Sequence, residues 1–235
     1  MLSIIILCVL IFILTFLWLF LKINTIPIVI ISLKRSQDRR DRLKVILKDI
    51  DYKIFDAIDG KNETEHIKTL KKKHVIDNTL NPGQIGCLLS HITLWEDFTN
   101  NNNNNKELLV LEDDIYVKSI FKDFIKTHVK YPENFDIIFL GHCAESKGDH
   151  IGRILNYKLH KSICPRCTHG YIISKKGAKE FLNYFNNNKI DMPIDEMLCR
   201  IINEKQLKSY SLYPTLINQD WQEENALPIP STITG

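Results

Sequence analysis

The chain has 235 residues, and its 31 Lys and Arg against 28 Asp and Glu give a formal net charge of +3. This charge is too small to indicate a nucleic-acid partner. Charged residues are 25% and aromatic residues 9% of the chain. These shares exclude long disorder, a collagen-like fibre and a small disulfide scaffold, and the length fits one large domain.

The N-terminal segment is apolar from Met1 to Leu21, and Ser3 and Thr15 are its only weakly polar residues. About 20 apolar residues are enough for a helix to cross a bilayer. We therefore expect residues 1–22 to form a single-pass N-terminal membrane anchor, with a cleaved signal sequence as the alternative. Basic residues follow the span, but some belong to the folded domain, so the side of the membrane stays open.

The rest of the chain, residues 23–235, alternates apolar runs with helical periods. The isoleucine-rich run Ile26–Leu33 is typical of a buried strand in a parallel sheet. Asn81 and Pro82 are a suitable cap and first-turn residue for a helix that continues to Phe98. Predicted strands are 26–33, 52–58, 107–111, 135–140, 168–174 and 207–213, and predicted helices are 36–50, 63–74, 83–98, 121–129, 175–185 and 190–203. This order predicts an α/β sandwich with a mainly parallel central sheet. The asparagine run 100–105 is a low-complexity surface loop.

The strand predicted over 107–111 runs into three acids, Glu112, Asp113 and Asp114. Ligands of open α/β sheets bind beyond the carboxyl ends of strands, and adjacent carboxylates repel unless a cation or water compensates them. If the chain stays extended, Glu112 and Asp114 point to the same side, which suits Mg²⁺ or Mn²⁺. A solvated turn is the alternative. A P-loop NTPase is excluded, because the sequence has no GxxxxGK[ST] loop.

Two further polar segments are candidate sites. Asp195, followed by Glu196, is either a helix cap or a carboxylate base in a cleft. The basic segment Ser32–Arg40 either holds a diphosphate at a helix N-terminus or forms a solvated helix face. His91 and His169 lie near apolar segments, where a single histidine is more often structural than catalytic.

The six cysteines leave the compartment open. Cys164 and Cys167 form a CxxC without the second pair of a four-cysteine zinc site, so we interpret them as structural thiols or a local disulfide, with metal binding as a third alternative. Cys87, Cys143 and Cys199 are interpreted as isolated, mostly buried residues.

Taken together and in order, these segments resemble glycosyltransferase family 25, which includes bacterial lipooligosaccharide glycosyltransferases and procollagen galactosyltransferases. The resemblance covers about residues 26–233. The matching segments are Ile30–Ser36 with Asp38–Arg40, Gly83–His91, Leu111–Asp114, Phe135–Gly141, Thr168–Ala178 and Pro193–Glu196, with Tyr213–Pro214 and Gln219 near the end. The asparagine run before the acidic motif and Gly170, where many relatives have a larger residue, depart from the pattern.

The resemblance implies a GT-A-like α/β/α fold, a UDP-sugar donor and Mn²⁺ (or Mg²⁺). Asp114 would be the direct metal ligand, with Glu112 helping through water or ribose. Asp195 would be the catalytic base, with Glu196 in reserve. Residues implied in donor or acceptor binding are Ser32, Leu33, Arg35, Arg39, Asp113, His91 and His169.

The function expected from this resemblance is transfer of a hexose, galactose or glucose, from a UDP-sugar to a hydroxyl of a glycolipid, glycan or protein, with inversion. The partners would be the nucleotide-sugar donor, that acceptor and the membrane, without nucleic acid. A catalytically silent relative that binds a carbohydrate or a protein is one alternative. A metal-dependent phosphohydrolase is the other.

Overall fold

The computed structural model describes residues 2–23, 26–62, 64–127, 131–145 and 147–219. The predicted helix boundaries at Glu63 and Val129, and the part of the resemblance beyond Gln219, lie outside these residues.

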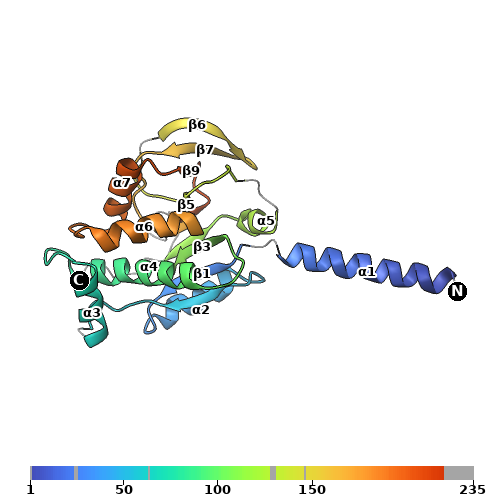
Figure 1. The fold of residues 1–235 in the computed structure, drawn as a ribbon, viewed down its shortest axis with the longest axis horizontal. Helices are drawn as coiled ribbons and strands as arrows, with labels where there is room; N and C mark the ends of the chain where they lie inside the picture. The colour runs from blue at the N-terminus through green and yellow to red at the C-terminus, as the bar shows by residue number, and fades with distance from the viewer. Residues whose placement is uncertain (1, 24–25, 63, 128–130, 146, 220–235) are drawn as a thin grey trace.

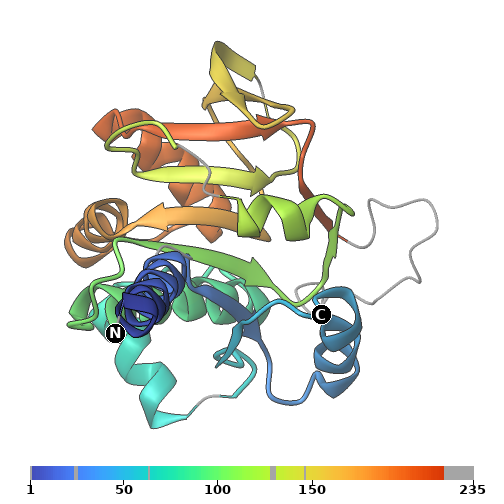
Figure 2. The same ribbon diagram turned by 90° about the vertical axis from the view of Figure 1, so that its right-hand side faces the viewer.

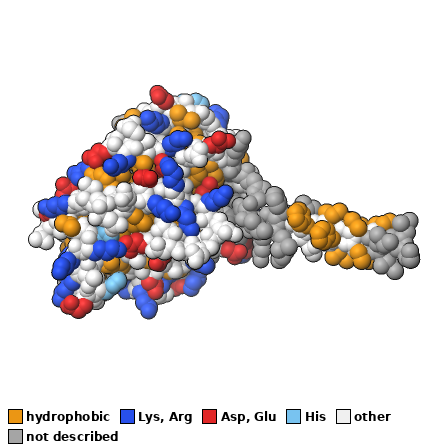
Figure 3. All heavy atoms as spheres, in the orientation of Figure 1, with side chains coloured by type: hydrophobic (Ala, Val, Ile, Leu, Met, Phe, Trp, Pro, Cys, Tyr) orange, Lys and Arg blue, Asp and Glu red, His pale blue; other side chains and the backbone are white. Residues whose placement is uncertain are grey.

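Helix α1 (Leu2–Ile23) extends away from the rest of the molecule (Figure 1). Its described side chains, from Ile6 to Phe16, are exposed, and they form the apolar surface at one end of Figure 3. Within the described residues, no helix combines the length and the apolar character that a bilayer crossing requires. This finding corrects the predicted anchor over residues 1–22, and with it the predicted membrane partner and membrane localisation.

One eight-stranded sheet organises the remaining chain, in the order β2-β1-β3-β8-β5-β9-β7-β6. A separate two-stranded sheet pairs β10 with β4. The strands are β1 (Ile28–Ser32), β2 (Lys53–Asp56), β3 (Glu107–Glu112), β4 (Ile115–Val117), β5 (Ile137–Gly141), β6 (Lys147–Ile154), β7 (Tyr157–Ser162), β8 (Gly170–Ser174), β9 (Ser209–Tyr213) and β10 (Ile217–Gln219).

The large sheet is mixed, which corrects the expectation of a mainly parallel sheet. Strand β1 pairs parallel with β2 and β3, and β5 pairs parallel with β9. Strand β8 lies antiparallel between β3 and β5, and the β6–β7 hairpin adds antiparallel pairings beside β9. Apolar runs show that a strand is buried, but they do not encode its direction.

Helices cover both faces of the sheet (Figures 1 and 2). The described helices after α1 are α2 (Gln37–Ile46), α3 (Glu65–Lys73), α4 (Pro82–Asn100), α5 (Phe121–Lys126), α6 (Lys175–Asn187) and α7 (Ile194–Lys205). One core packs α4, α6 and α7 against the sheet, around Trp95 and Phe181. The other core packs α2 and α5 against the opposite face, around Leu43 and Phe121. Buried strands alternate their side chains between the two cores, as Val110 and Leu111 do.

Helix α4 begins where the sequence predicts. The Asn81 side chain accepts a hydrogen bond from the Gln84 backbone N–H (2.9 Å), and the Gln84 side chain accepts one from the Asn81 N–H (3.0 Å). This capping box satisfies two N–H groups that a helix start would otherwise leave unpaired. The helix then carries Cys87 and His91, one turn apart, past the carboxyl ends of β1 and β3. The mostly exposed residues Asn101–Asn105 connect α4 to β3.

Candidate functional site

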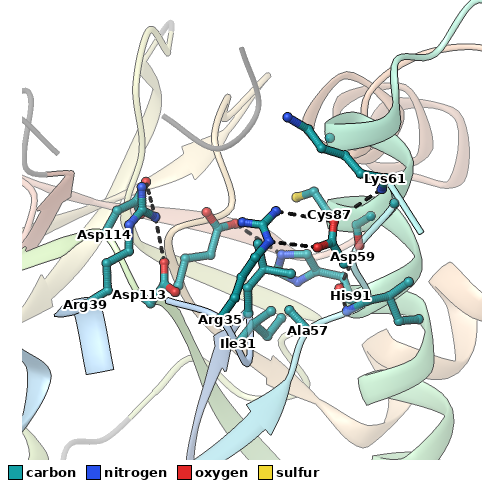
Figure 4. Close-up of a pocket in the computed structure, with 17 residues that line it drawn as sticks. Ile31, Arg35, Arg39, Ala57, Asp59, Lys61, Cys87, His91, Asp113 and Asp114 are labelled. Atoms are coloured by element: carbon teal, nitrogen blue, oxygen red, sulfur yellow. Dashed lines mark hydrogen bonds and ion pairs between the residues drawn. The ribbon is translucent and has the colours of Figure 1, made fainter. Parts of the chain in front are cut away.

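A cavity of about 80 Å³, open to solvent on one side, lies at the carboxyl ends of β1 and β3 (Figure 4). Its position is the one that open α/β sheets use for ligands. The residues that line it are Ile31, Leu33, Arg35, Arg39, Ala57, Ile58, Asp59, Gly60, Lys61, Gly83, Gly86, Cys87, Ser90, His91, Glu112, Asp113 and Asp114.

The three consecutive acids all line this cavity, but not on an extended chain. Strand β3 ends at Glu112, and the chain turns at Asp113 and Asp114 before β4. The Arg42 guanidinium holds this turn by donating to the backbone carbonyls of Asp113 (3.3 Å) and Ile115 (3.0 Å). The extended chain on which the predicted alternation of Glu112 and Asp114 was conditional is therefore absent, because the chain turns at Asp113 and Asp114.

Asp113 forms a buried ion pair. Arg39 Nη1 donates to Asp113 Oδ1 at 2.8 Å, and the two side chains are 6% and 10% exposed. The same nitrogen lies 4.0 Å from Asp114 Oδ2. Arg39 thus joins α2 to the acidic turn and offsets its negative charge.

Glu112 lies at the end of a chain of hydrogen bonds. Trp95 Nε1 donates to the Tyr171 hydroxyl (3.0 Å), and that hydroxyl lies 2.7 Å from His91 Nδ1. Because indole N–H is only a donor, the Tyr171 proton is free to point to His91 Nδ1. His91 then carries its proton on Nε2, which lies 3.1 Å from Glu112 Oε1.

A second donor reaches the same carboxylate, because Thr168 Oγ1 donates to Glu112 Oε1 at 2.6 Å. Burial alone would raise the pKa of Glu112, but the hydrogen bonds from His91 and Thr168 outweigh it and hold that pKa below its usual range. Glu112 is thus held as a carboxylate in a defined orientation.

The mouth of the cavity carries exposed cationic groups. Arg35 makes a bidentate pair with Asp59, with Nε at 2.8 Å and Nη2 at 3.3 Å from its oxygens. The hydrogen bond from Arg35 lowers the pKa of Asp59. Lys61 lies at the same edge (Figure 4). Arg35 and Lys61 together would attract a phosphate-bearing ligand.

The wall between these groups and α4 is made of backbone. A Cβ atom on Gly60 would lie 1.8 Å from the Pro82 carbonyl oxygen, and one on Gly86 would lie 2.7 Å from the Ile58 carbonyl oxygen. Only glycine fits this close approach at either position.

Several cavity residues were not predicted as site residues. Asp59 and Gly60 end the second predicted strand, and their position beside the carboxyl end of β1 was the available signal. Cys87 was interpreted as an isolated buried residue. Burial and the nearby carboxylates of Glu112, Asp195 and Asp114 raise the pKa of its thiol well above the usual value.

Other predicted residues lie outside the cavity lining. Ser32 is buried, and its hydroxyl accepts a hydrogen bond from Arg40 Nε at 3.1 Å. His169 is fully buried, lies 3.3 Å from the Ile217 carbonyl oxygen through Nε2, and has a pKa lowered to about 4 by burial. Asp195 and Glu196 lie in the first turn of α7. Asp195 accepts hydrogen bonds from the N–H groups of Cys167 (3.1 Å) and Glu196 (3.0 Å).

The acidic turn fits a divalent cation held by Asp114. Asp114 lines the cavity with 21% of its side chain exposed, and its Oδ2 accepts a hydrogen bond from Gln219 Nε2 at 3.4 Å. Mg²⁺ and Mn²⁺ are commonly held by one or two carboxylates together with ligand phosphates and water.

Two other clusters of ligand-type side chains carry softer atoms. Among the described residues, each places three such atoms within 4.8 Å of one another: Cys143, Cys167 and His169, and Cys87, His91 and Glu112. Neither is the all-oxygen shell that Mg²⁺ or Mn²⁺ prefers.

The cysteines correct two expectations. Cys143 pairs with Cys167, and Cys164 pairs with Cys199. The CxxC is thus neither a local disulfide nor a pair of free thiols, and Cys143 and Cys199 are not isolated. Sequence spacing does not reveal which cysteines the fold brings together.

Comparison with known proteins identifies the family. The model of glycosyltransferase family 25 (LPS biosynthesis protein) matches residues 25–198. Procollagen galactosyltransferase 1-B of Xenopus laevis is 31% identical over 232 residues, which cover 91% of this chain and 37% of that protein. Human procollagen galactosyltransferase 2 is 29% identical over 210 residues, covering 82% of this chain and 33% of that protein. The chain thus spans about a third of the length of these relatives.

Among solved structures, a glycosyltransferase involved in the glycosylation of the major capsid of PBCV-1 matches with a TM-score of 0.39 and 8% identity, over 83% of this chain and 92% of that one. The family model covers most of the folded chain, including β1, α4 and the acidic turn that form the cavity. The chain belongs to glycosyltransferase family 25.

Proposed function

We propose that this family 25 domain transfers a hexose, galactose or glucose, from a UDP-sugar to a hydroxyl of a glycan, glycolipid or protein, with inversion. The observation that carries the proposal is the composition of the cavity. Cations at its mouth, Arg35 and Lys61, suit a diphosphate, and the acidic turn at Asp114 suits the divalent cation that would accompany it. The names of the galactosyltransferase relatives support galactose as the first sugar to test.

We assign each residue of the cavity a role according to its place in it. Arg35 and Lys61 would bind the phosphates, and Arg39 would hold the acidic turn through Asp113. Asp114 would hold Mn²⁺ or Mg²⁺, which supplies positive charge to the departing diphosphate. Glu112, oriented by His91 and Thr168, would accept hydrogen bonds from hydroxyls of the donor.

The proposed transfer step needs one base. The acceptor hydroxyl oxygen forms a bond to the anomeric carbon, the bond from that carbon to the phosphate oxygen breaks, and UDP leaves with the electron pair. Asp195 takes the hydroxyl proton. Its proximity to the cavity is supported by two adjacent residues: the Cys167 N–H donates to Asp195 Oδ2 (3.1 Å), and the Thr168 hydroxyl donates to Glu112 of the cavity lining (2.6 Å).

A second candidate function is carbohydrate or protein binding without transfer. It is favoured by the hydrogen bonds of Asp195, because both of its oxygens already accept backbone N–H groups, as they would in a purely structural helix start. A silent relative would bind UDP and release none from a UDP-sugar.

The test is UDP release by the full chain from UDP-galactose, UDP-glucose and other UDP-sugars, with Mn²⁺ or with EDTA. Metal-dependent release from one donor is expected. Inversion predicts that hydrolysis of UDP-α-galactose first yields β-galactose, which NMR detects before mutarotation. UDP binding without release from any donor, with or without candidate acceptors, would favour the second function.

Asp114→Asn tests the role of the acidic turn. We expect UDP release to fall about 100-fold or more while the free energy of unfolding changes by less than about 0.5 kcal/mol. Asp49→Asn is the matched control, because Asp49 is an exposed carboxylate paired with Lys122 outside the cavity. Equal activity in Asp114→Asn and the control would contradict the metal assignment.

A further inference from the structure

A short irregular segment connects β7 to β8 and is covalently fixed at two points. We call residues 163–169 the strap. Cys164 ties the strap to Cys199 on α7, and Cys167 ties it to Cys143, just after β5. Two disulfides on a segment this short leave its backbone little freedom.

The strap contacts the groups on both sides of the proposed reaction. The Cys167 N–H donates to Asp195 Oδ2 at 3.1 Å, and the Thr168 hydroxyl donates to Glu112 Oε1 at 2.6 Å. The His169 carbonyl accepts from the Glu112 N–H at 3.0 Å. Adjacent residues of one segment thus hold the proposed base and the carboxylate at the end of β3.

The backbone of Cys167 has an unusual conformation. Its φ of 68° lies in the left-handed region, which residues other than glycine, asparagine and aspartate rarely adopt. Such a conformation costs free energy and persists only when the surrounding structure imposes it. Two observed constraints do so, the bond to Cys143 and the hydrogen bond from the Cys143 N–H to the Arg166 carbonyl (2.9 Å).

We infer that the Cys143–Cys167 disulfide is a positioning element for the transfer reaction. It holds Cys167 in the left-handed conformation, so that the hydrogen bonds of the strap keep the carboxylates of Asp195 and Glu112 in position. This inference rests on the proposed function, because it assigns the disulfide a role in that reaction. The Cys164–Cys199 disulfide has a different role. It fastens the strap to α7, which the buried residues Met197, Leu198, Ile201 and Ile202 already hold in the core.

Three double variants of the full chain separate positioning from folding. Cys143→Ser/Cys167→Ser removes the positioning disulfide. Cys164→Ser/Cys199→Ser is the matched control, which removes one disulfide from the same strap. Cys143→Ser/Cys167→Gly also removes the positioning disulfide but places glycine, which adopts positive φ without a steric penalty, at the left-handed position.

We measure kcat and KM for UDP release from UDP-galactose with Mn²⁺. The first variant is expected to lose about 10- to 100-fold in kcat with little change in KM, since misplacement of a reacting group by about 1 Å has that effect. The control is expected to stay within about twofold of the unmodified chain, because α7 keeps its core contacts. The glycine variant is expected to recover most of the lost kcat.

Full kcat in the first variant, or equal losses in the first variant and the control, would overturn the inference. Absence of recovery with glycine would also overturn it, because conformation would then not be what the disulfide supplies. Hydrogen exchange of the Cys167 and Thr168 amides gives an independent reading. Exchange should be faster in the first variant and slow again with glycine. If the unmodified chain releases UDP from no donor, the proposed function fails, and the exchange pattern alone shows whether the disulfide holds the strap.

Discussion

Two arginine–aspartate pairs border the same cavity, and they differ in burial rather than in chemistry. Arg35 and Asp59 pair at the mouth with side chains 49% and 21% exposed, whereas Arg39 and Asp113 pair within the acidic turn with side chains 6% and 10% exposed. Both contain a nitrogen–oxygen contact of 2.8 Å. Contact distance alone therefore says nothing about what each pair does.

Burial decides the role of each pair. An exposed ion pair contributes about 0–1 kcal/mol, so Arg35 can exchange Asp59 for a ligand phosphate at small cost. Removing one partner of a buried pair leaves an unpaired charge away from water and costs much more. The outer pair is suited to binding, and the inner pair to holding α2 and the end of β3 together.

The largest expected effect comes from breaking the inner pair. Arg39→Met should lower the free energy of unfolding by about 3–5 kcal/mol, because Asp113 is left buried without its cation. Urea unfolding followed by circular dichroism measures the loss. Arg39→Met/Asp113→Leu should recover most of the stability, because no buried charge remains. A double variant as unstable as the single one would show that the charge of Asp113 is not the cause.

An intermediate effect is expected at the outer pair. Arg35→Gln should change the free energy of unfolding by less than about 1 kcal/mol and weaken UDP binding about 10-fold, equivalent to about 1.4 kcal/mol. Calorimetric titration with UDP and Mn²⁺ measures the affinity. Asp59→Asn is the companion variant, since it removes the same pair and keeps the cation. Equal weakening in both would mean that the pair itself, and not the cation of Arg35, serves binding.

The smallest effect is expected at His74, a buried basic side chain near the end of α3. Burial lowers its pKa, and Lys73 adds to the lowering while Glu96 opposes it. Below about pH 6.5 the unfolded chain binds a proton that the folded His74 does not. The free energy of unfolding should therefore fall as the pH drops from 7 toward 5.

The slope of stability with pH identifies the contribution of His74. In His74→Gln the slope between pH 7 and pH 5 should be shallower than in the unmodified chain. His66→Gln, on the exposed face of α3, should keep the original slope. Identical slopes in all three proteins would show that a titratable group other than His74 causes the pH dependence of stability.

The sequence predicted the parts of the fold whose signals are local. The Asn81 cap with Pro82 located α4, and the apolar runs located β1 and β3 with the acids at the end of β3. The β6–β7 hairpin was missed because β6 is largely exposed and lacks an apolar run.

The contacts of the candidate site were harder to predict than the fold, because they join residues that are far apart in the sequence. Glu112, Arg39 and Asp114 were predicted as site residues from two separate segments, and all three line the cavity. The partner of Arg39 is 74 positions away, and its choice of Asp113 depends on the turn after β3. The relay from Trp95 through Tyr171 to His91 joins α4 to β8. No pattern in the sequence links residues that only the packed fold brings into contact.

The close approach at Gly60 and Gly86 has a consequence for engineering this cavity. Backbone rather than side chains sets the separation between α4 and the loop after β2, so the frame of the cavity does not depend on the residues that would contact a ligand. Substitutions at Ala57 or Lys61 can alter the size and charge of the cavity without changing the separation between α4 and the loop after β2. Gly60→Ala would instead force the two segments apart and change every contact across the cavity at once.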